Sequence, residues 1–224
     1  MVSIVVPTLN EETRIAGTLQ ALQSLPGDKQ ILIADGGSED RTADIATELG
    51  VRVVACPRGR GCQIRTAAAE AKGDVLWFVH ADTRPAAGAL EAMEKALTSS
   101  SVIGGNFSLI FEGEHYSAGQ MTAIYPCLRW LGLSYGDAGI FIRRSVYDAI
   151  GGCRPYPLFE DLDLVRRMKR HGRFVHLDTR IFTSARRFTG SPYARVWALW
   201  ITLQVLYWAG VSPYRLARWY RQAR

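Results

Sequence analysis

The sequence predicts an α/β fold with an open, mostly parallel or mixed sheet, flanked by helices and followed by a helical C-terminal appendage. Short apolar runs alternate with helical patterns over the first half of the chain, which is typical of βαβ units. These runs lack polar alternation, as expected for parallel strands that helices cover on both faces. The chain has 224 residues, 48% hydrophobic and 21% charged. This composition excludes disordered, collagen-like and ordinary polytopic membrane proteins.

Four strands and the helices between them account for the first half. The strands are the apolar runs Met1–Val6, Gln30–Ala34, Val51–Ala55 and Val75–Val79. A first helix follows the segment TLNEE, which supplies an N-cap and acids for the first turn. A second helix ends at Gly50, and an alanine-rich third covers Cys62–Lys72 and ends at a glycine. Ligands of such sheets bind at the carboxyl ends of the strands, so we expect the site there.

The second half is less regular. We expect strands at Val102–Phe111, Gly136–Arg143, Phe174–Leu177 and Ile181–Ser184. A charged helix is expected at Glu160–His171. The apolar run Val196–Val211 follows, and a Ser-Pro pair separates it from a basic final helix. No repeat or low-complexity linker is visible. The sequence therefore predicts one catalytic-type domain over residues 1–190 and an apolar and basic helical appendage over residues 191–224.

Positive charge is concentrated in the C-terminal quarter. The formal net charge is +6, but eight arginines and no acidic residue follow Asp178. The rest of the chain is slightly acidic, so we expect no nucleic-acid partner and instead contact of the C-terminal quarter with an anionic surface. No signal peptide is apparent, and the scattered cysteines predict neither a disulfide framework nor a zinc site. We therefore expect a cytoplasmic protein, with the inner face of the membrane as one place of action.

Acidic residues follow three of the predicted strands or turns. Asp35 and Asp82 each end an apolar strand, and Glu160-Asp161 follows a proline-rich turn. Any one of these acids could simply cap the next helix. Two carboxylates at the ends of strands of one sheet, however, would converge on one crevice and would need a cation or N–H donors to offset their repulsion. Carboxylate oxygens without clustered Cys or His favour magnesium or manganese.

A glycine-rich turn, Gly59-Arg60-Gly61, opens the alanine-rich helix. Free amides at a helix N-terminus beside arginines can bind an anion, although such a turn is more often only a turn. The spacing of a P-loop lysine is missing, and no GxGxxG follows the first strand. P-loop and Rossmann dinucleotide sites are therefore excluded.

Five segments together resemble the family 2 glycosyltransferases of the GT-A fold. They are VSIVVPTLNEE, ADGGSEDRT, RGCQIRTAAAEAKGDVLWFVHADT, GDAGIFIRR and FEDLDLVRRMKRHG. The match runs in the right order over roughly residues 2–190 and is more specific than any single motif. FVHADT in so short a chain resembles a small bacterial subset associated with arsenosugar biosynthesis.

The resemblance implies a function for particular residues. The implied nucleotide-binding residues are Pro7, Thr8 and Glu11 in the first loop, Asp35 and Ser38 in the second, Arg60 and Arg65 near the diphosphate, and Arg187 facing the leaving phosphates. Asp161 is implied as the general base, with Glu160 beside it to raise its pKa. Asp82 matches the last acid of the family's Asp-X-Asp metal motif. His80 stands at the first acid and is either a metal ligand or a strand-end histidine bonded to the backbone.

The resemblance implies an inverting transfer of one sugar from a nucleotide-diphosphate sugar, UDP by family frequency, to a hydroxyl acceptor, helped by magnesium or manganese. Metal and arginines would offset the charge of the leaving phosphates. The Gln-X-X-Arg-Trp motif of processive synthases is missing, which favours a single transfer. For Asp163 we expect stabilisation of the helix N-terminus and pairing with Arg166, Arg167 or Lys169.

The appendage allows two interpretations. Its apolar run of 16 residues is shorter than the ~20 that span a bilayer, but tryptophans and arginines at helix boundaries are typical of interfacial membrane helices. A lipid-linked acceptor would fit that interpretation; docking on the domain or on a second copy is the other.

Two rival functions remain at this point. One is a nucleotidyltransferase of similar architecture, although the first loop lacks the glycine-rich signature with lysine that such enzymes usually carry. The other is a non-catalytic, membrane-associated nucleotide-sugar-binding protein. Asp82 and Asp161 are both present, which disfavours it, and His80 in place of an acid mildly favours it.

Overall fold

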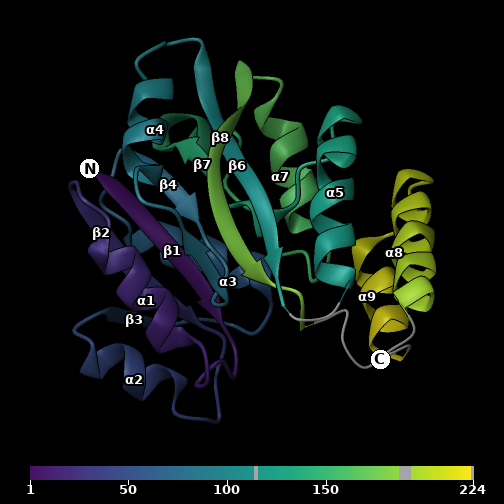
Figure 1. Ribbon diagram of the computed structural model, residues 1–224, viewed down its shortest axis with the longest axis horizontal. Coiled ribbons are helices and arrows are strands. Elements are labelled where there is room, and N and C mark those ends of the chain that lie inside the picture. Colours follow the sequence, from purple (N-terminus) through teal and green to yellow (C-terminus); the bar gives the residue numbers. More distant parts are fainter. Residues whose placement is uncertain (114–115, 187–192, 223–224) are drawn as a thin grey trace.

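A single eight-stranded sheet with helices on both faces forms the centre of the protein (Figure 1). The computed structural model describes residues 1–113, 116–186 and 193–222. The strands are β1 (Val2–Thr8), β2 (Lys29–Asp35), β3 (Arg52–Ala55), β4 (Val75–Phe78), β5 (Thr83–Pro85), β6 (Val102–Glu112), β7 (Ile140–Arg143) and β8 (Arg173–Ser184). Their order in the sheet is β3-β2-β1-β4-β7-β6-β8-β5.

Nine helices are described along with one 3-10 turn. The helices are α1 (Ile15–Ser24), α2 (Thr42–Glu48), α3 (Arg60–Glu70), α4 (Ala89–Ala96), α5 (Ser117–Trp130), α6 (Arg144–Ala149), α7 (Glu160–Met168), α8 (Tyr193–Trp208) and α9 (Pro213–Gln222), and the 3-10 turn is η1 (Gly136–Ala138). Apolar residues of α1, α2, α4 and α5 pack on one face of the sheet. Those of α3, α6 and α7 pack on the other. Both faces are thus covered, which explains why the strand sequences lack polar alternation.

The parallel half of the sheet confirms the α/β prediction. β1 lies between β2 and β4 and is parallel to both, and β2 is parallel to β3. The register pairs Thr8 with Asp35, so the loops after β1 and β2 leave the sheet side by side. This edge is where ligands of open α/β sheets bind.

The other half makes the sheet mixed. β7 is antiparallel to both β4 and β6, β8 is parallel to β6, and the short β5 is antiparallel to β8. The long strands β6 and β8 run together across the molecule toward α5 (Figure 1). The prediction of an open, mostly parallel or mixed sheet flanked by helices is confirmed, and its strand arrangement is that of the GT-A fold.

Several predicted boundaries in this half were wrong for physical reasons. The expected strand Gly136–Arg143 starts only at Ile140, because the preceding residues form η1. The two strands expected after Arg173 are one strand, β8, in which an irregularity of the β6–β8 pairing accommodates the polar residues between Leu177 and Arg180. The charged helix ends at Met168 rather than His171.

The C-terminal helices form a third, smaller apolar cluster. Leu203 of α8 and Leu216 of α9 pack with Leu158, Phe159 and Leu162 at the start of α7. The two helices lie together beside α5, at the end of the molecule farthest from β3 (Figure 1). Among the residues that the structure describes, no helix combines the length and apolarity needed to cross a bilayer. The division into residues 1–190 and 191–224 stays a prediction.

Substitution of Gly105 by Ala tests the pairing of β6 with β7 and β8. A Cβ at this position of β6 would overlap the carbonyl oxygen of Val175 and lie 2.8 Å from the ring of Phe141. We expect the free energy of unfolding to fall by about 3 kcal/mol, measured by denaturant titration. Gly17→Ala in α1 is the control, because its Cβ meets nothing within 4 Å and helix propensity should raise stability by ~0.5–1 kcal/mol. Equal effects of the two variants would contradict this account.

Candidate active site

The loops after β1 and β2 are joined through Asp35. Its carboxylate accepts hydrogen bonds from the amides of Gly37 and Ser38, both at 3.0 Å, from Ser38 Oγ at 2.5 Å, and from Thr8 Oγ1 at 3.4 Å. Asp35 is only 8% exposed, so these donors offset the cost of burying its charge. Pro7 precedes Thr8, the last residue of β1. The first group of predicted nucleotide-binding residues is therefore assembled in one place.

A buried amide from α3 fixes the ends of both strands. Gln63 Nε2 donates to the carbonyl oxygens of Thr8 and Ala34 at 2.7 and 2.8 Å. Sequence reasoning missed this residue, because a polar residue in an alanine-rich helix looks solvent-exposed until its partners are known. Gln63 holds α3 against the edge where Arg60, at the start of that helix, enters the site.

Glu11 and Asp82 share one arginine. Arg186, which follows β8, forms an ion pair with Glu11 and a second with Asp82 Oδ2 at 3.2 Å. The first loop, the segment between β4 and β5 and the end of β8 are joined at this point. Arg186 was not among the predicted site residues, although it belongs to the same SARRF segment as the predicted Arg187. Arg187 itself lies outside the described residues.

A second set of charges surrounds His80. Its Nδ1 lies 2.8 Å from Asp137 Oδ1, and its Nε2 lies 3.4 Å from a guanidinium nitrogen of Arg60. Arg60 can only donate, so this contact is favourable when Nε2 carries the lone pair and Nδ1 carries the proton. Asp137 thereby sets the tautomer of His80. The sequence analysis missed Asp137 because its segment, GDAG, was expected to be part of a strand, whereas it forms the turn η1.

The carboxylates at the start of α7 lie next to this set. Glu160 is 1% exposed and forms an ion pair with Arg60. Asp161 accepts hydrogen bonds from the amides of Gly136 at 2.7 Å and Leu162 at 2.8 Å. Phe159, just before them, adopts a left-handed conformation with φ 61°, and such strained residues cluster at functional sites.

The position of Asp161 alters its ionisation. The pKa of Asp161 is raised to about 6: burial is the largest cause and the charge of Glu160 adds to it, whereas Arg60 and the two amide hydrogen bonds oppose the shift. The direction agrees with the prediction, but burial rather than repulsion by Glu160 is the largest cause. A carboxylate with such a pKa is suited to accept a proton near neutral pH.

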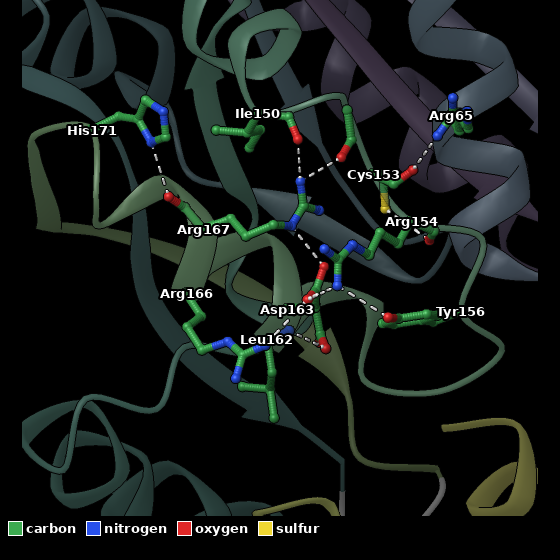
Figure 2. A network of polar contacts seen from close by, with 12 residues as sticks. Arg65, Ile150, Cys153, Arg154, Tyr156, Leu162, Asp163, Arg166, Arg167 and His171 are labelled. Carbon is green, nitrogen blue, oxygen red and sulfur yellow. Dashed lines mark hydrogen bonds and ion pairs between the residues drawn. The ribbon is translucent and has the colours of Figure 1, made fainter. Parts of the chain in front are cut away.

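The contacts of Asp163 fix the start of α7 (Figure 2). Asp163 has no exposed surface and pairs with Arg167 at 2.8 Å, Arg154 at 3.3 Å and Arg166 at 3.6 Å. Arg167 also donates to the carbonyl oxygens of Ile150 and Gly152, both at 2.8 Å. The network joins α7 to the loop before it, and the expected pairing of Asp163 with Arg166 and Arg167 is found.

One predicted residue lies apart from the carboxylates. Arg65 is exposed on α3, and its guanidinium lies 3.5 Å from the carbonyl oxygen of Cys153 (Figure 2). It contacts the loop before α7 instead of the ends of the strands. The predicted grouping of Arg65 with Arg60 near the diphosphate stays a prediction.

The donor atoms present fit one kind of metal site. The described residues include no group of three His, Cys, Asp or Glu side chains that could hold an ion. Both ring nitrogens of His80 have partners, and Asp82 faces Arg186. Magnesium and manganese can be held through one or two carboxylates, with the remaining ligands taken from phosphate and water. Asp82 is the carboxylate of this group that fits such a site, in exchange for its contact with Arg186.

Comparison with known proteins defines the family. The fold is that of GT-A glycosyltransferases of known structure. The sequence profile of glycosyl transferase family 2 matches residues 3–159, and the chain belongs to this family.

Two curated relatives are similar along most of the chain. A probable glycosyltransferase, YdaM, of Bacillus subtilis (strain 168) is 26% identical over 225 residues, covering 89% of this chain and 52% of the relative. Beta-monoglucosyldiacylglycerol synthase of Synechocystis sp. is 28% identical over 200 residues, covering 76% of this chain and 40% of the relative. The chain thus spans about half or less of the length of these relatives.

Solved structures share the fold. Mannosyltransferase PcManGT of Pyrobaculum calidifontis, in complex with GDP-Man and Mn²⁺, superposes with a TM-score of 0.72 at 17% identity, covering 91% of this chain and 61% of that one. Glucosyl-3-phosphoglycerate synthase of Mycobacterium tuberculosis, in complex with Mn²⁺, UDP and glucosyl-3-phosphoglycerate, gives 0.62 at 21% identity, covering 80% and 70%.

The raised pKa of Asp161 predicts a pH dependence of stability. The native protein keeps this proton up to about pH 6, whereas an aspartate in the unfolded chain loses it around its ordinary pKa of 3.8. Stability therefore falls as pH rises through this window, by up to ~3 kcal/mol relative to the Asp161→Asn variant. Denaturant titrations of both proteins at pH 4, 5, 6 and 7 measure the difference. Parallel curves would show that the pKa is not raised.

Loss of the Asp163 charge should destabilise the protein. In Asp163→Asn, the guanidinium of Arg167, which is 9% exposed, loses its carboxylate partner, and breaking a buried pair in this way costs about 3–5 kcal/mol. The control is Asp148→Asn, at an exposed acid of α6. Denaturant titration at pH 7 compares the two. If the free energy of unfolding of Asp163→Asn fell by less than about 1 kcal/mol, as for a surface ion pair, the network around Asp163 would not be a major contributor to stability.

Proposed function

We propose that this protein is a glycosyltransferase that transfers a single sugar from a nucleotide-diphosphate sugar to a hydroxyl acceptor with inversion at the anomeric carbon. The observation that carries the proposal is Asp161. It is a buried carboxylate with a pKa of about 6, next to the ion pair of Arg60 and Glu160. Membership of glycosyl transferase family 2 supports the reaction class.

Asp161 is the proposed general base. The acceptor oxygen attacks the anomeric carbon and forms the new C–O bond, while the bond from that carbon to the phosphate oxygen breaks and the nucleoside diphosphate leaves with the electron pair. The acceptor proton moves to Asp161. The amides of Gly136 and Leu162 hold the carboxylate in a fixed orientation, and a single in-line displacement without an enzyme nucleophile gives inversion. The proposed role of Glu160 is to raise the pKa of Asp161 through its negative charge and to position Arg60 through their ion pair.

The loops after β1 and β2 are the proposed nucleotide site. Asp35 and Thr8 are held in one hydrogen-bonded group with Ser38, while Pro7 lies near the end of β1 and Glu11 lies in the first of these loops. We propose a UDP-sugar as donor. Complexes of the structural relatives contain UDP in one case and GDP-Man in the other, so GDP is the alternative to test. Arg60, and by family resemblance Arg65 and Arg187, would offset the charge of the diphosphate.

A divalent ion, manganese or magnesium, is proposed to accompany the donor. When bound, it would offset negative charge on the leaving phosphates. Asp82 would hold it, and His80 would be a second ligand only if its Nε2 exchanged Arg60 for the ion. Structural relatives were solved with Mn²⁺, and the carboxylate chemistry of Asp82 suits either metal.

The partners of the C-terminal helices stay at the level of proposals. Exposed apolar residues of α8 and α9, among them Ile201, Val205 and Trp208, suit contact with a membrane surface or a second copy. A lipid-linked acceptor and action at the inner face of the membrane would agree with the first. The arsenosugar-associated subset suggested by FVHADT also stays a prediction.

The Asp161→Asn variant tests the proposal. Removal of the general base should lower turnover by roughly 10²–10⁴-fold, while binding of the nucleoside diphosphate is retained. Nucleotide release from UDP-glucose and GDP-mannose, each with manganese and a panel of hydroxyl acceptors, is the assay. Asp148→Asn on α6 is the matched control and should keep full turnover. Wild-type turnover in Asp161→Asn would refute the assignment of the base.

A further inference from the structure

An apolar pocket of about 80 Å³ lies directly beside the proposed base. Several helices and loops contribute to it, and its apolar lining includes Phe111, Met121, Leu128, Phe159, Trp197 and Trp200. Its volume is several times the ~10–15 Å³ that one water needs. The charged side chains of the lining are those of Arg60, Asp137 and Asp161, and the other lining residues are aromatic or aliphatic.

Most polar groups of this wall are already engaged or belong to the reaction; the exception is the hydroxyl of Tyr125, which is buried without a hydrogen-bond partner among the residues that the structure describes. The hydroxyl of Tyr135 donates to Gln204 Oε1 at 3.0 Å. Arg60 pairs with Glu160, and Asp137 pairs with His80. A carbohydrate in this pocket would bring several hydroxyl groups, each of which would need a partner to offset its lost hydration. The pocket offers polar partners at Asp161 and Tyr125, too few for all the hydroxyl groups of a sugar, and apolar surface to the rest of the molecule.

Helix α8 forms one wall of the pocket through Trp197 and Trp200. Trp197 and Trp200 are one helical turn apart and therefore lie on the same face of α8. The ring of Trp200 also packs against Tyr220 of α9, with 5.8 Å between centroids. From the other side, α5 contributes Met121, which is 7% exposed, and its neighbours. The pocket thus depends on the C-terminal helices, which the sequence analysis could not assign to a function.

We propose that this pocket binds the apolar body of the acceptor and that the acceptor is an alcohol whose hydroxyl is carried on an alkyl or aromatic group, not a sugar or other polyol. This inference rests on the proposed function, because it names the acceptor class for the same site. The hydroxyl faces Asp161, and the apolar group lies against Trp200, Leu128 and Met121. Affinity for the acceptor comes from buried apolar surface.

Binding of small alcohols tests the pocket. The probes are hexan-1-ol and benzyl alcohol against glycerol and glucose at equal concentration, with UDP and manganese present, measured by saturation-transfer NMR. Trp200→Ala opens the wall, and Leu128→Gln places an amide in it. Trp130→Ala is the matched control, because Trp130 on α5 is 87% exposed and does not line the pocket. Retained nucleotide binding shows that each variant is folded.

We expect the apolar alcohols to bind at least tenfold more tightly than glycerol or glucose, and expect this preference to be lost in Trp200→Ala and Leu128→Gln but kept in Trp130→Ala. Mass spectrometry should detect the alkyl glycoside when UDP-glucose or GDP-mannose replaces the nucleotide. Equal or better binding of the polyols, or a preference unchanged in both pocket variants, would overturn the inference. Glycosylation of a polyol in preference to bound hexan-1-ol would do the same.

The two proposals fail in different ways. If the protein binds neither nucleotide but still binds apolar alcohols through Trp200, the glycosyltransferase proposal fails and the acceptor assignment fails with it, while the pocket itself is confirmed. If nucleotide binds and polyols are the acceptors, the glycosyltransferase proposal stands and only the acceptor class is wrong.

Discussion

The ion pair between Arg60 and Glu160 is the contact on which the site depends. The two residues are 100 positions apart in the sequence and each begins a helix, α3 and α7, on the same face of the sheet. A buried Glu160 without Arg60 would carry an uncompensated charge in a region of low dielectric. The pair therefore fixes where the two helix starts meet, and Asp161 is placed as a consequence.

The electrostatics of the site follow from this arrangement. Burial raises the pKa of Asp161 and Glu160 adds to the shift, but Arg60 and two backbone amides limit it, so that the pKa is about 6 and the carboxylate is ionised at neutral pH. Asp163 lies two residues further along α7 and neutralises the arginines that anchor the preceding loop. We thus propose different roles for two nearby acids on one helix: Asp161 as the general base and Asp163 as the partner of structural ion pairs.

The sequence predicted the features that are encoded locally. Apolar runs indicated β1 to β4, an acid after a strand indicated Asp35, and acids after a proline-rich turn indicated Asp161, because strand ends and helix starts have short-range signals. Features that depend on long-range contacts were missed. Gln63 can hydrogen-bond to Thr8 and Ala34 only because β1 and β2 are adjacent in the sheet. Asp137 lies beside His80 only because the turn η1 forms where a strand was expected. Helix α5 was not predicted, since Pro126 lies within it and its apolar residues serve both core and pocket.

Titration calorimetry of the purified protein with UDP and with GDP, each with and without manganese, tests the central claim most directly. The account predicts binding of one of the two nucleotides that manganese strengthens, because Asp82 is the proposed holder of the metal and Arg60 a proposed partner of the diphosphate. Absence of binding for both nucleotides would contradict the donor site. Binding that ignores manganese would contradict the metal role of Asp82 and leave the arginines as the groups that hold the diphosphate.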